Sequence, residues 1–278
     1  MTESRSMRIC NTCSTTIRKS RSVVFDMERQ LIFDYPGNNS DIDQRFAAYL
    51  AGKTVAIVGR MNLHELEQGD FIDSHDVVVR IHSAIPYTPD ITGKPAATAQ
   101  TPREFEKFVG TRTDVFYHRF LSNVELFKES GQITPWIIDE CEQFKRRGGS
   151  FMCYEDPNNM PLRFAIGCLP MEMRFLNGAI YAELARRLVK DLVEPGVVII
   201  SDILSHDIKS AYITGVPCYF DEMFDLSTER AQKWSKLRDI NELRFLYELS
   251  KDDRVTCDSI MNSLFERYVI KGELPRQA

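Results

Sequence analysis

The residues best suited to bind a ligand lie between positions 53 and 82, in and beside two apolar runs. The first run, 55–58, ends at Gly59, and the second run, 77–81, contains Arg80. A strand that stops at glycine and opens into a turn often begins a phosphate site in α/β proteins, because glycine lets the backbone approach an anion. The spacing therefore predicts that a nucleotide-type anion binds at the carboxyl ends of these two strands.

Arg80 has two interpretations. An arginine inside an apolar strand is unfavourable unless it is paired. Asp73 and Asp114 are candidate partners for a structural ion pair. Alternatively, Arg80 and His82 lie at the carboxyl edge of the sheet, where ligands bind in open parallel sheets. The sequence leaves both interpretations open.

Two other kinds of site are disfavoured. The fingerprint of dinucleotide binders is not met, because residues 60–63 lack its second and third glycines. Cys10 and Cys13 have the spacing of half a zinc site, but no second pair of similar spacing follows. Asp41 and Asp43 lie at a helix start, where helix capping explains them. We therefore expect no metal ion and no cofactor.

The elements that must position these residues alternate along the chain. Strands are predicted at 55–58, 77–81, 115–117, 209–215 and 255–257, with weaker candidates at 136–138 and 151–154. Helices are predicted at 40–50, 101–108, 176–193, 240–249 and 260–268, with another beginning at Ser122. Such alternation predicts an α/β fold, with a mostly parallel sheet covered by helices on both faces.

Length and composition narrow the class of protein. A chain of 278 residues fits one large α/β domain; we expect it over 40–278, after a polar, basic extension at 1–39. With 35 basic and 40 acidic residues, the chain has no electrostatic footprint for nucleic acid. No apolar run is long enough to span a membrane, and no signal peptide is visible. Seven cysteines, an odd number, favour free thiols and a cytoplasmic protein.

Three segments resemble the sialyl motifs of the animal-type sialyltransferases and their bacterial and viral relatives, glycosyltransferase family 29. Residues 53–82 and 108–114 are similar to the long motif, through Ile-Asp-Ser-His-Asp at 72–76 and Val-Gly-Thr-Arg-Thr at 109–113. Residues 196–215 resemble the short motif, and 242–258 resemble the segment after the very short motif. The resemblance implies a Rossmann-like, GT-A-variant-like fold, in which 197–200 begins a helix rather than a strand.

The resemblance also implies an activity. Its members transfer sialic acid from CMP-sialic acid to a glycan hydroxyl with inversion and without a metal ion. Carried over by position, Gly59 and Arg60 would lie near the phosphate and Gly196 near the sugar. The donor-binding residues implied in this way are Gly59, Arg60, Asn62, Ser74, Arg80, His82, Thr111, Pro195 and Gly196. The implied partners are a CMP-sugar donor and a glycan or glycoconjugate acceptor.

This chain departs from the family at the catalytic position. The family's histidine falls on Leu237, whereas its glutamate is matched by Glu242. Leucine cannot transfer a proton, and losing a general acid or base typically lowers the rate about 10²–10⁴-fold. His118 and His75 are possible substitutes, although a lone histidine is often structural. The catalytic candidates are therefore His118, His75 and Glu242.

Three functions remain open at this stage. The first is a sialyltransferase-like enzyme that uses a CMP-activated acidic sugar. The second is a catalytically impaired module on the same scaffold, which binds a nucleotide or another protein and is favoured by Leu237. The third is an unrelated α/β enzyme such as a methyltransferase or dehydrogenase, and the missing glycine fingerprint disfavours it.

Overall fold

The computed structural model describes residues 40–59, 66–81, 102–118, 135–154, 172–190, 193–216 and 240–273. For residues 40, 102–105, 118 and 135–140 it describes the backbone alone. The predicted extension at 1–39 and the predicted helix beginning at Ser122 lie outside these ranges.

The described residues contain one sheet of seven parallel strands in the order β5-β4-β3-β2-β1-β6-β7. The strands are β1 (Thr54–Val58), β2 (Val77–Ile81), β3 (Val115–His118), β4 (Phe151–Tyr154), β5 (Met173–Phe175), β6 (Ser210–Thr214) and β7 (Val255–Cys257). Because all strands are parallel, residues that follow a strand share one edge of the sheet, here called the carboxyl edge. Residues that precede a strand share the opposite, amino edge. The predicted Rossmann-like α/β fold is confirmed.

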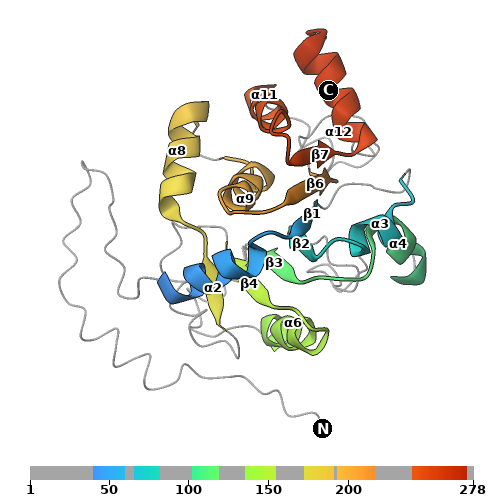
Figure 1. Ribbon diagram of the computed structural model, residues 1–278, viewed down its shortest axis with the longest axis vertical. Coiled ribbons are helices and arrows are strands. Elements are labelled where there is room, and N and C mark those ends of the chain that lie inside the picture. The colour runs from blue at the N-terminus through green and yellow to red at the C-terminus, as the bar shows by residue number, and fades with distance from the viewer. Residues whose placement is uncertain are drawn as a thin grey trace, which may run out of the picture.

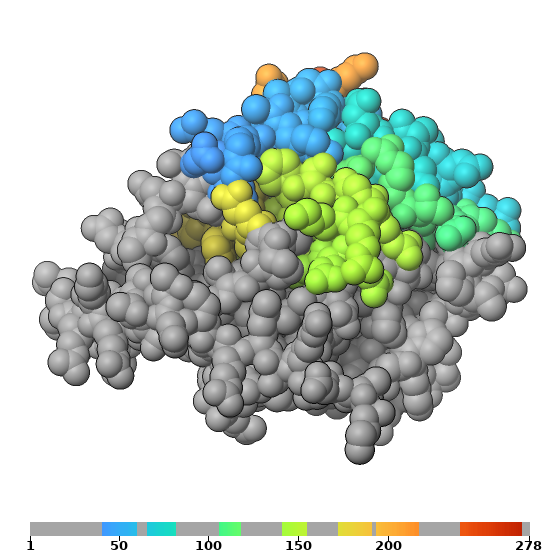
Figure 2. All heavy atoms as spheres, turned by 90° about the horizontal axis from the view of Figure 1, so that it is seen from below, coloured from blue at the N-terminus to red at the C-terminus, as the bar shows by residue number. Residues whose placement is uncertain are grey.

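Helices cover both faces of the sheet (Figure 1). One face carries α2 (Ser40–Leu50), α8 (Gly178–Leu188), α9 (Pro195–Leu204) and α11 (Ile240–Leu249), and the other carries α3 (Gly69–Asp73), α4 (Pro102–Val109) and α6 (Pro135–Arg146). After β7, α12 (Ser259–Leu264) continues into η3 (Phe265–Ile270), which packs against α11. Seen from below, α2 and the residues joining α6 to β4 form neighbouring parts of one surface (Figure 2).

The central strand β2 shows why the sheet is buried on both faces. Its five residues, Val-Val-Val-Arg-Ile, are all buried. Val77, Val79 and Ile81 belong to the larger core on the side of α9, whereas Val78 packs with Ile72 on the side of α3. Burying one such apolar side chain stabilises the fold by roughly 1.5–3 kcal/mol. A near-continuous apolar run is therefore what a parallel strand needs.

Helix α9 is the element that composition alone would misassign. Its Val-Val-Ile-Ile run has the composition of a strand, yet the structure forms a helix whose residues are mostly buried. Pro195 occupies the first turn, where its fixed φ favours a helix, and the Glu194 side chain caps the N-terminus. A helix that is apolar on nearly every side belongs in the interior, here between the sheet and α8.

One predicted strand was wrong, one predicted helix is shorter than expected, and one strand was not predicted. The strand predicted at 136–138 is part of α6, which begins at Pro135, a residue favoured in the first turn of a helix. The helix predicted at 176–193 spans Gly178–Leu188, with its N-terminus capped by Asn177. The short strand β5, which precedes that helix, was not predicted, since three residues show no clear alternation.

The point where the strand order reverses lies between β1 and β6. From β1 the chain proceeds through β2, β3, β4 and β5 on one side, and it then returns to β6 on the other side of β1. In open α/β sheets, ligands bind at the carboxyl edge beside such a reversal, because the flanking connections diverge there. We therefore expect a ligand site at the carboxyl ends of β1 and β6.

Candidate functional site

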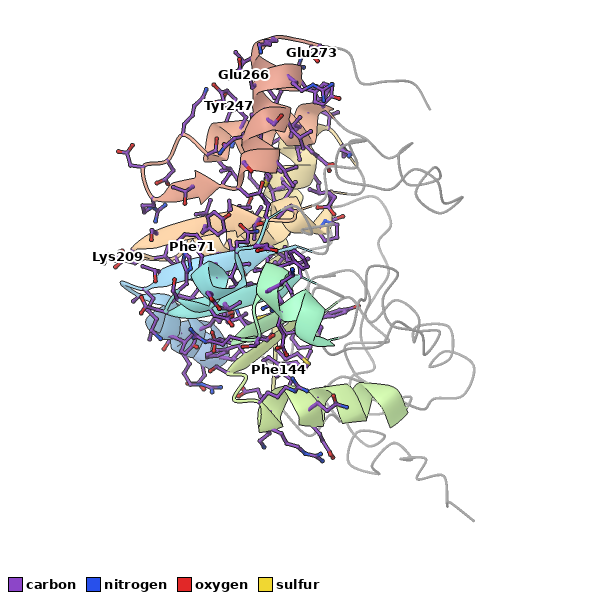
Figure 3. The ribbon with its side chains drawn as sticks, turned by 90° about the vertical axis from the view of Figure 1, so that its right-hand side faces the viewer. Phe71, Phe144, Lys209, Tyr247, Glu266 and Glu273 are labelled. Carbon is purple, nitrogen blue, oxygen red and sulfur yellow. The ribbon has the colours of Figure 1, made fainter. Side chains whose placement is uncertain are left out.

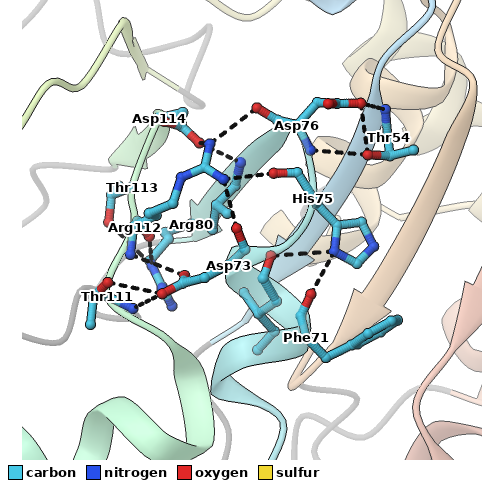
Figure 4. Close-up of polar contacts among 12 residues, drawn as sticks. Thr54, Phe71, Asp73, His75, Asp76, Arg80, Thr111, Arg112, Thr113 and Asp114 are labelled. Carbon is cyan, nitrogen blue, oxygen red and sulfur yellow. Dashed lines mark hydrogen bonds and ion pairs between the residues drawn. The ribbon is translucent and has the colours of Figure 1, made fainter.

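The two segments that resemble the long motif bind each other at the amino edge (Figure 4). The carboxylate of Asp73 accepts hydrogen bonds from the backbone N–H and the hydroxyl of Thr111, at 2.7 and 2.8 Å, and from the N–H of Arg112 at 3.1 Å. Gly110 has a φ of +72°, and a Cβ at this position would overlap the Asp73 carboxylate. Asp73, Gly110 and Thr111 therefore join α3 to the loop before β3, and each contributes through its residue type.

Arg112 extends this contact to the start of β2. Its Nη1 donates to the carbonyls of Asp73 and His75, both at 2.7 Å, and its Nη2 forms an ion pair with Asp114 at 2.8 Å. Asp114 in turn accepts from the N–H of Val78 at 2.8 Å. One guanidinium thus joins the loops that enter β2 and β3.

A further contact ties β1 to the same edge. The Asp76 carboxylate accepts from the backbone N–H and the hydroxyl of Thr54 at 2.9 and 2.8 Å, and Thr54 Oγ1 accepts from the Asp76 N–H at 2.9 Å. Hydrogen bonds from the Thr54 backbone and hydroxyl lower the pKa of Asp76. The motif residues therefore align the entries of three neighbouring strands.

Arg80 is fully buried in β2, beside Val58 of β1. Its Nε donates to the Arg112 carbonyl at 2.8 Å, and its Nη2 donates to the Val109 carbonyl at 2.7 Å. Thr113 Oγ1 lies 3.2 Å from Nε. Nε and Nη2 therefore bind the loop before β3, at the amino edge, and the donor-binding role of Arg80 stays a prediction.

Three other predicted site residues also lie at the amino edge. Ser74 donates its hydroxyl to the Phe71 carbonyl at 2.7 Å, and His75 Nδ1 lies 2.9 Å from the same oxygen. The His75 ring stacks on Tyr212, and Thr111 binds Asp73. In Figure 3, Phe71 and Lys209 mark this edge. Ser74, His75 and Thr111 precede parallel strands, so they lie at the opposite edge from residues that follow those strands. Their expected roles stay predictions.

Gly59 and Gly196, in contrast, are brought together at the carboxyl edge. The Gly59 N–H donates to the Thr214 carbonyl at 2.8 Å, and a Cβ on Gly59 would overlap the Gly215 carbonyl. A Cβ on Gly196 would lie 2.5 Å from Val216 Cγ1. Both predicted glycines therefore contact the turn that follows β6, at the point where the strand order reverses. A Cβ on Gly59 would overlap backbone atoms, whereas a Cβ on Gly196 would require the side chains of Val216 and Glu194 to shift.

The N-terminus of α9 lies at this edge and already carries an anion. The Glu194 carboxylate accepts the Gly196 N–H at 2.5 Å, and Glu194 is only 8% exposed. Glu242, a predicted catalytic residue, is buried, accepts the Glu194 N–H at 2.8 Å and pairs with Lys190 at 2.9 Å. Glu242 therefore fixes the start of α9, where Pro195 is the first residue. Glu194 was not among the predicted site residues.

Several predicted residues lie outside the described part of the chain. These are Arg60, Asn62 and His82, together with Leu237 at the family's catalytic position. The backbone of His118 is described at the carboxyl end of β3, where it pairs with Tyr154 of β4. His118 thus lies at the same edge as Gly59 and Gly196.

A buried ionic cluster, which the sequence reasoning did not identify, joins β3, β5, α2 and α9. Arg174 Nη1 and Nη2 donate to the two carboxylate oxygens of Asp202 at 2.5 and 3.0 Å, while Nε donates to Asp43 at 2.8 Å. Arg174 also lies over the ring of Phe46. Tyr117 donates its hydroxyl to Asp202, and burial, followed by the charge of Asp202, raises the pKa of Tyr117. The available signal was a charged residue within two apolar segments, Arg174 in β5 and Asp202 in α9.

His206 gives this cluster a predicted dependence on pH. Its Nε2 is buried, has no hydrogen-bond partner among the described residues and lies 4.0 Å from Asp202 Oδ1. Burial lowers the pKa of His206. Between this folded value and the unfolded value of about 6.5, the unfolded chain binds more protons, so the free energy of unfolding decreases as the pH falls.

The measurement is urea unfolding at several pH values from about 7.5 to 5, the range in which an unfolded histidine titrates. We expect the His206→Gln variant to lose less stability than the wild type over this range. The carboxylates common to both proteins cancel in the comparison. Parallel stability curves for the two proteins would show that His206 does not contribute.

Three general properties apply to the described residues. No group of three or more His, Cys, Asp or Glu side chains among them could hold a metal ion. None of the described helices has the length and apolar character needed to cross a bilayer. Cys141, Cys153 and Cys257 are free thiols. The cytoplasmic location and the single domain over 40–278 stay predictions.

Comparisons with known proteins find likeness in structure but not in sequence. No protein-family model and no curated protein matches the chain. A mammalian sialyltransferase structure is similar over 82% of this chain and 81% of that chain, with a TM-score of 0.43 and 12% identity. A mammalian sialyltransferase in complex with Gal-beta-1-3GalNAc-ortho-nitrophenol gives 0.43 and 14%, covering 81% of each chain.

A bacterial structure is also similar. It is the sialyltransferase CstII from Campylobacter jejuni in complex with the substrate analogue CMP-3FNeuAc, with a TM-score of 0.46 and 11% identity over 76% of this chain and 83% of that one. At such identities the likeness assigns no role to any single residue.

Proposed function

We propose that this chain is a sialyltransferase-like glycosyltransferase that binds a CMP-sugar donor at the carboxyl edge, between β1 and β6. The proposal rests on the motif resemblance and on one geometric observation. Gly59 and Gly196, predicted for the phosphate and sugar ends of the donor, both contact the turn at Gly215 and Val216. Glycines at these positions let a ligand approach the backbone closely beside the N-terminus of α9, where the N–H groups of Gly59 and Gly196 already bind the Thr214 carbonyl and the Glu194 carboxylate.

The reaction is a substitution at the anomeric carbon of the acidic sugar. The acceptor hydroxyl forms a new C–O bond, while the bond to the CMP phosphate breaks and its electron pair leaves with the phosphate. A base must take the hydroxyl proton, and His118 is the candidate because its backbone lies at the carboxyl edge. Arg60, Asn62 and His82 remain proposed donor contacts, and the acceptor is a glycan hydroxyl.

A second function is favoured by two observations. Leu237 stands at the family's catalytic position, and the Glu194 carboxylate already binds the Gly196 N–H. The alternative is a catalytically impaired module that binds a nucleotide, or another protein, on the same scaffold. The two functions differ in whether a bound CMP-sugar is converted to product.

The experiment is a product assay with CMP-sialic acid and a panel of glycan acceptors. If His118 replaces the missing histidine, the wild type forms product and His118→Gln lowers kcat about 10²–10⁴-fold. If the chain is an impaired module, the wild type forms no product, whereas Leu237→His gains measurable transfer or hydrolysis. An active wild type that is unaffected by His118→Gln would exclude His118 as the base.

Glu194 provides a prediction about donor affinity. A buried carboxylate at the helix N-terminus repels a second anion there, and neutralising it removes that repulsion. We expect Glu194→Gln to bind CMP-sialic acid about tenfold more tightly, in keeping with a partly screened charge pair. The same change weakens the helix cap, so the free energy of unfolding should fall by about 1 kcal/mol. Isothermal titration and urea unfolding measure the two effects.

Glu183→Gln is the matched control. Glu183 lies exposed on α8 and pairs with Arg186, so this variant makes the same change in net charge away from the N-terminus of α9. It should bind the donor as the wild type does. Equal affinities of Glu194→Gln and the wild type would mean that no donor anion approaches this helix end.

A further inference from the structure

A carboxylate at the end of β7 holds the turn around which the two site glycines meet. Asp258 is 3% exposed, and its Oδ2 accepts the hydroxyl of Thr214 at 2.7 Å and the N–H of Gly215 at 3.0 Å. Its Oδ1 accepts the N–H of Met261 at 2.7 Å and so caps α12. Both oxygens are therefore used, and the carboxylate bridges β6 and the helix after β7.

The contact continues from β6 to β1. Thr214 is fully buried, and its carbonyl accepts the Gly59 N–H at 2.8 Å. Thr214 therefore connects Asp258 to Gly59: its hydroxyl binds the Asp258 carboxylate, and its carbonyl binds the Gly59 N–H. This series of hydrogen bonds joins the carboxyl ends of β7, β6 and β1.

A second group supports the same threonine from the side of α3. Gln68 Nε2 donates to Thr214 Oγ1 at 2.6 Å, and Gln68 Oε1 accepts the hydroxyl of Tyr212. Gln68 precedes α3 in the connection that leaves Gly59. Burial, followed by the charge of Asp258, raises the pKa of Tyr212 to about 12, so the hydroxyl remains a donor at neutral pH. Thr214 is therefore held on both sides.

We propose that Asp258 is a positioning residue: its carboxylate fixes the turn at Thr214 and Gly215, and thereby the backbone of Gly59 at the nucleotide-sugar site. This inference rests on the proposed function for its ligand, but the effect on Gly59 is independent of any ligand. A site at which the ligand approaches the backbone closely tolerates little displacement, since a shift of about 1 Å can lower activity about 10²-fold. A buried carboxylate shared by three partners is suited to prevent such a shift.

The test compares three variants of the full chain. Asp258→Asn retains the size of the side chain but places a donor where an acceptor is needed. Thr214→Val keeps the shape of Thr214 and the α12 cap while removing the hydroxyl, and it serves if Asp258→Asn does not fold. Asp202→Asn is the matched control, because Asp202 is equally buried but binds Arg174 in the cluster near α2.

Amide hydrogen exchange and CMP titration are the two readouts. We expect amide exchange at Gly59 and Gly215 to become about tenfold faster, or more, in Asp258→Asn and Thr214→Val. In Asp202→Asn, exchange at these two glycines should increase no more than the loss of global stability in that variant explains. CMP affinity should fall about tenfold in the first two variants and stay within about twofold of the wild type in the control.

The outcomes separate this inference from the proposed function. Unchanged exchange at Gly59 in both variants, or the same local change in Asp202→Asn, would overturn the positioning role. A wild type that binds no cytidine ligand would refute the donor site, while the exchange at Gly59 still decides whether Asp258 holds the turn. Faster exchange with unchanged CMP affinity would also refute the role, because the turn would then not shape the site.

Discussion

Replacing Asp202 by alanine is expected to lower the free energy of unfolding by about 3–5 kcal/mol, a large part of the stability of a typical domain. The reason is that Arg174 is 2% exposed and binds both carboxylate oxygens of Asp202. Without these carboxylate oxygens, the buried guanidinium of Arg174 retains only its ion pair with Asp43 among these contacts. The Asp43 side chain is 40% exposed. An unpaired buried charge is more harmful than the loss of the pair itself.

Urea unfolding measures this effect, and two variants control it. A double variant, Asp202→Leu with Arg174→Met, removes both charges and should recover most of the lost stability, as hydrophobic replacement of buried ion pairs often does. Tyr117→Phe removes one hydroxyl from the cluster and should cost about 1 kcal/mol. An Asp202→Ala variant within about 1 kcal/mol of the wild type would show that solvent reaches the cluster.

Replacing Arg80 by leucine is expected to lower the free energy of unfolding by about 3 kcal/mol or more, because buried carbonyl groups lose a charged donor. Arg80 is fully buried and binds the carbonyls of Val109 and Arg112. The matched control is Arg186→Leu on the exposed surface of α8, where the side chain is 75% exposed and the change should stay within about 0.5 kcal/mol.

The Arg80 variant also separates the two interpretations of this residue. A structural arginine affects stability first, and it affects CMP binding only as far as the fold is disturbed. An arginine that contacts the phosphate directly would instead weaken CMP binding at nearly unchanged stability. The second outcome, measured by urea unfolding and titration on the same preparation, would contradict the side-chain contacts described here.

The sequence predicted the sheet well because parallel strands are marked by apolar runs. β1, β2, β3, β4, β6 and β7 fall at predicted positions, and β4 was the weaker of these predictions. The prediction failed at β5, which is too short to show a period, and at 136–138, which lies within the first turns of α6. Only the motif resemblance predicted that 197–200 begins a helix, since the composition of this segment favours a strand.

The sequence did not predict at which edge of the sheet each candidate site residue lies, and the reason is geometric. Whether a residue precedes or follows a strand decides which edge it occupies, and this separates Ser74, His75 and Thr111 from Gly59. Side-chain direction is a further property that linear order does not contain. The backbone of Arg80 pairs with Val58 of β1 near the carboxyl edge, yet Nη2 of its guanidinium binds the Val109 carbonyl in the loop before β3.

Glu194 shows that a local signal was present but unused. A glutamate followed by proline and glycine at the start of an apolar helix is a capping arrangement, which is visible in the sequence. Its importance comes only from tertiary structure, because α9 begins beside Val216, in the turn after β6. Asp258 is similar: its capping of α12 is local, whereas its contact with β6 is not.

The most direct test of the account is a calorimetric titration of the full chain with CMP, CMP-sialic acid, UMP and NAD. The account predicts that the two cytidine ligands bind and the others do not. It also predicts that Gly196→Val, whose side chain would meet Val216 and Glu194, abolishes this binding while the protein stays folded by circular dichroism. Absence of binding by both cytidine ligands, or unchanged binding by Gly196→Val, would contradict a donor site at the ends of β1 and β6.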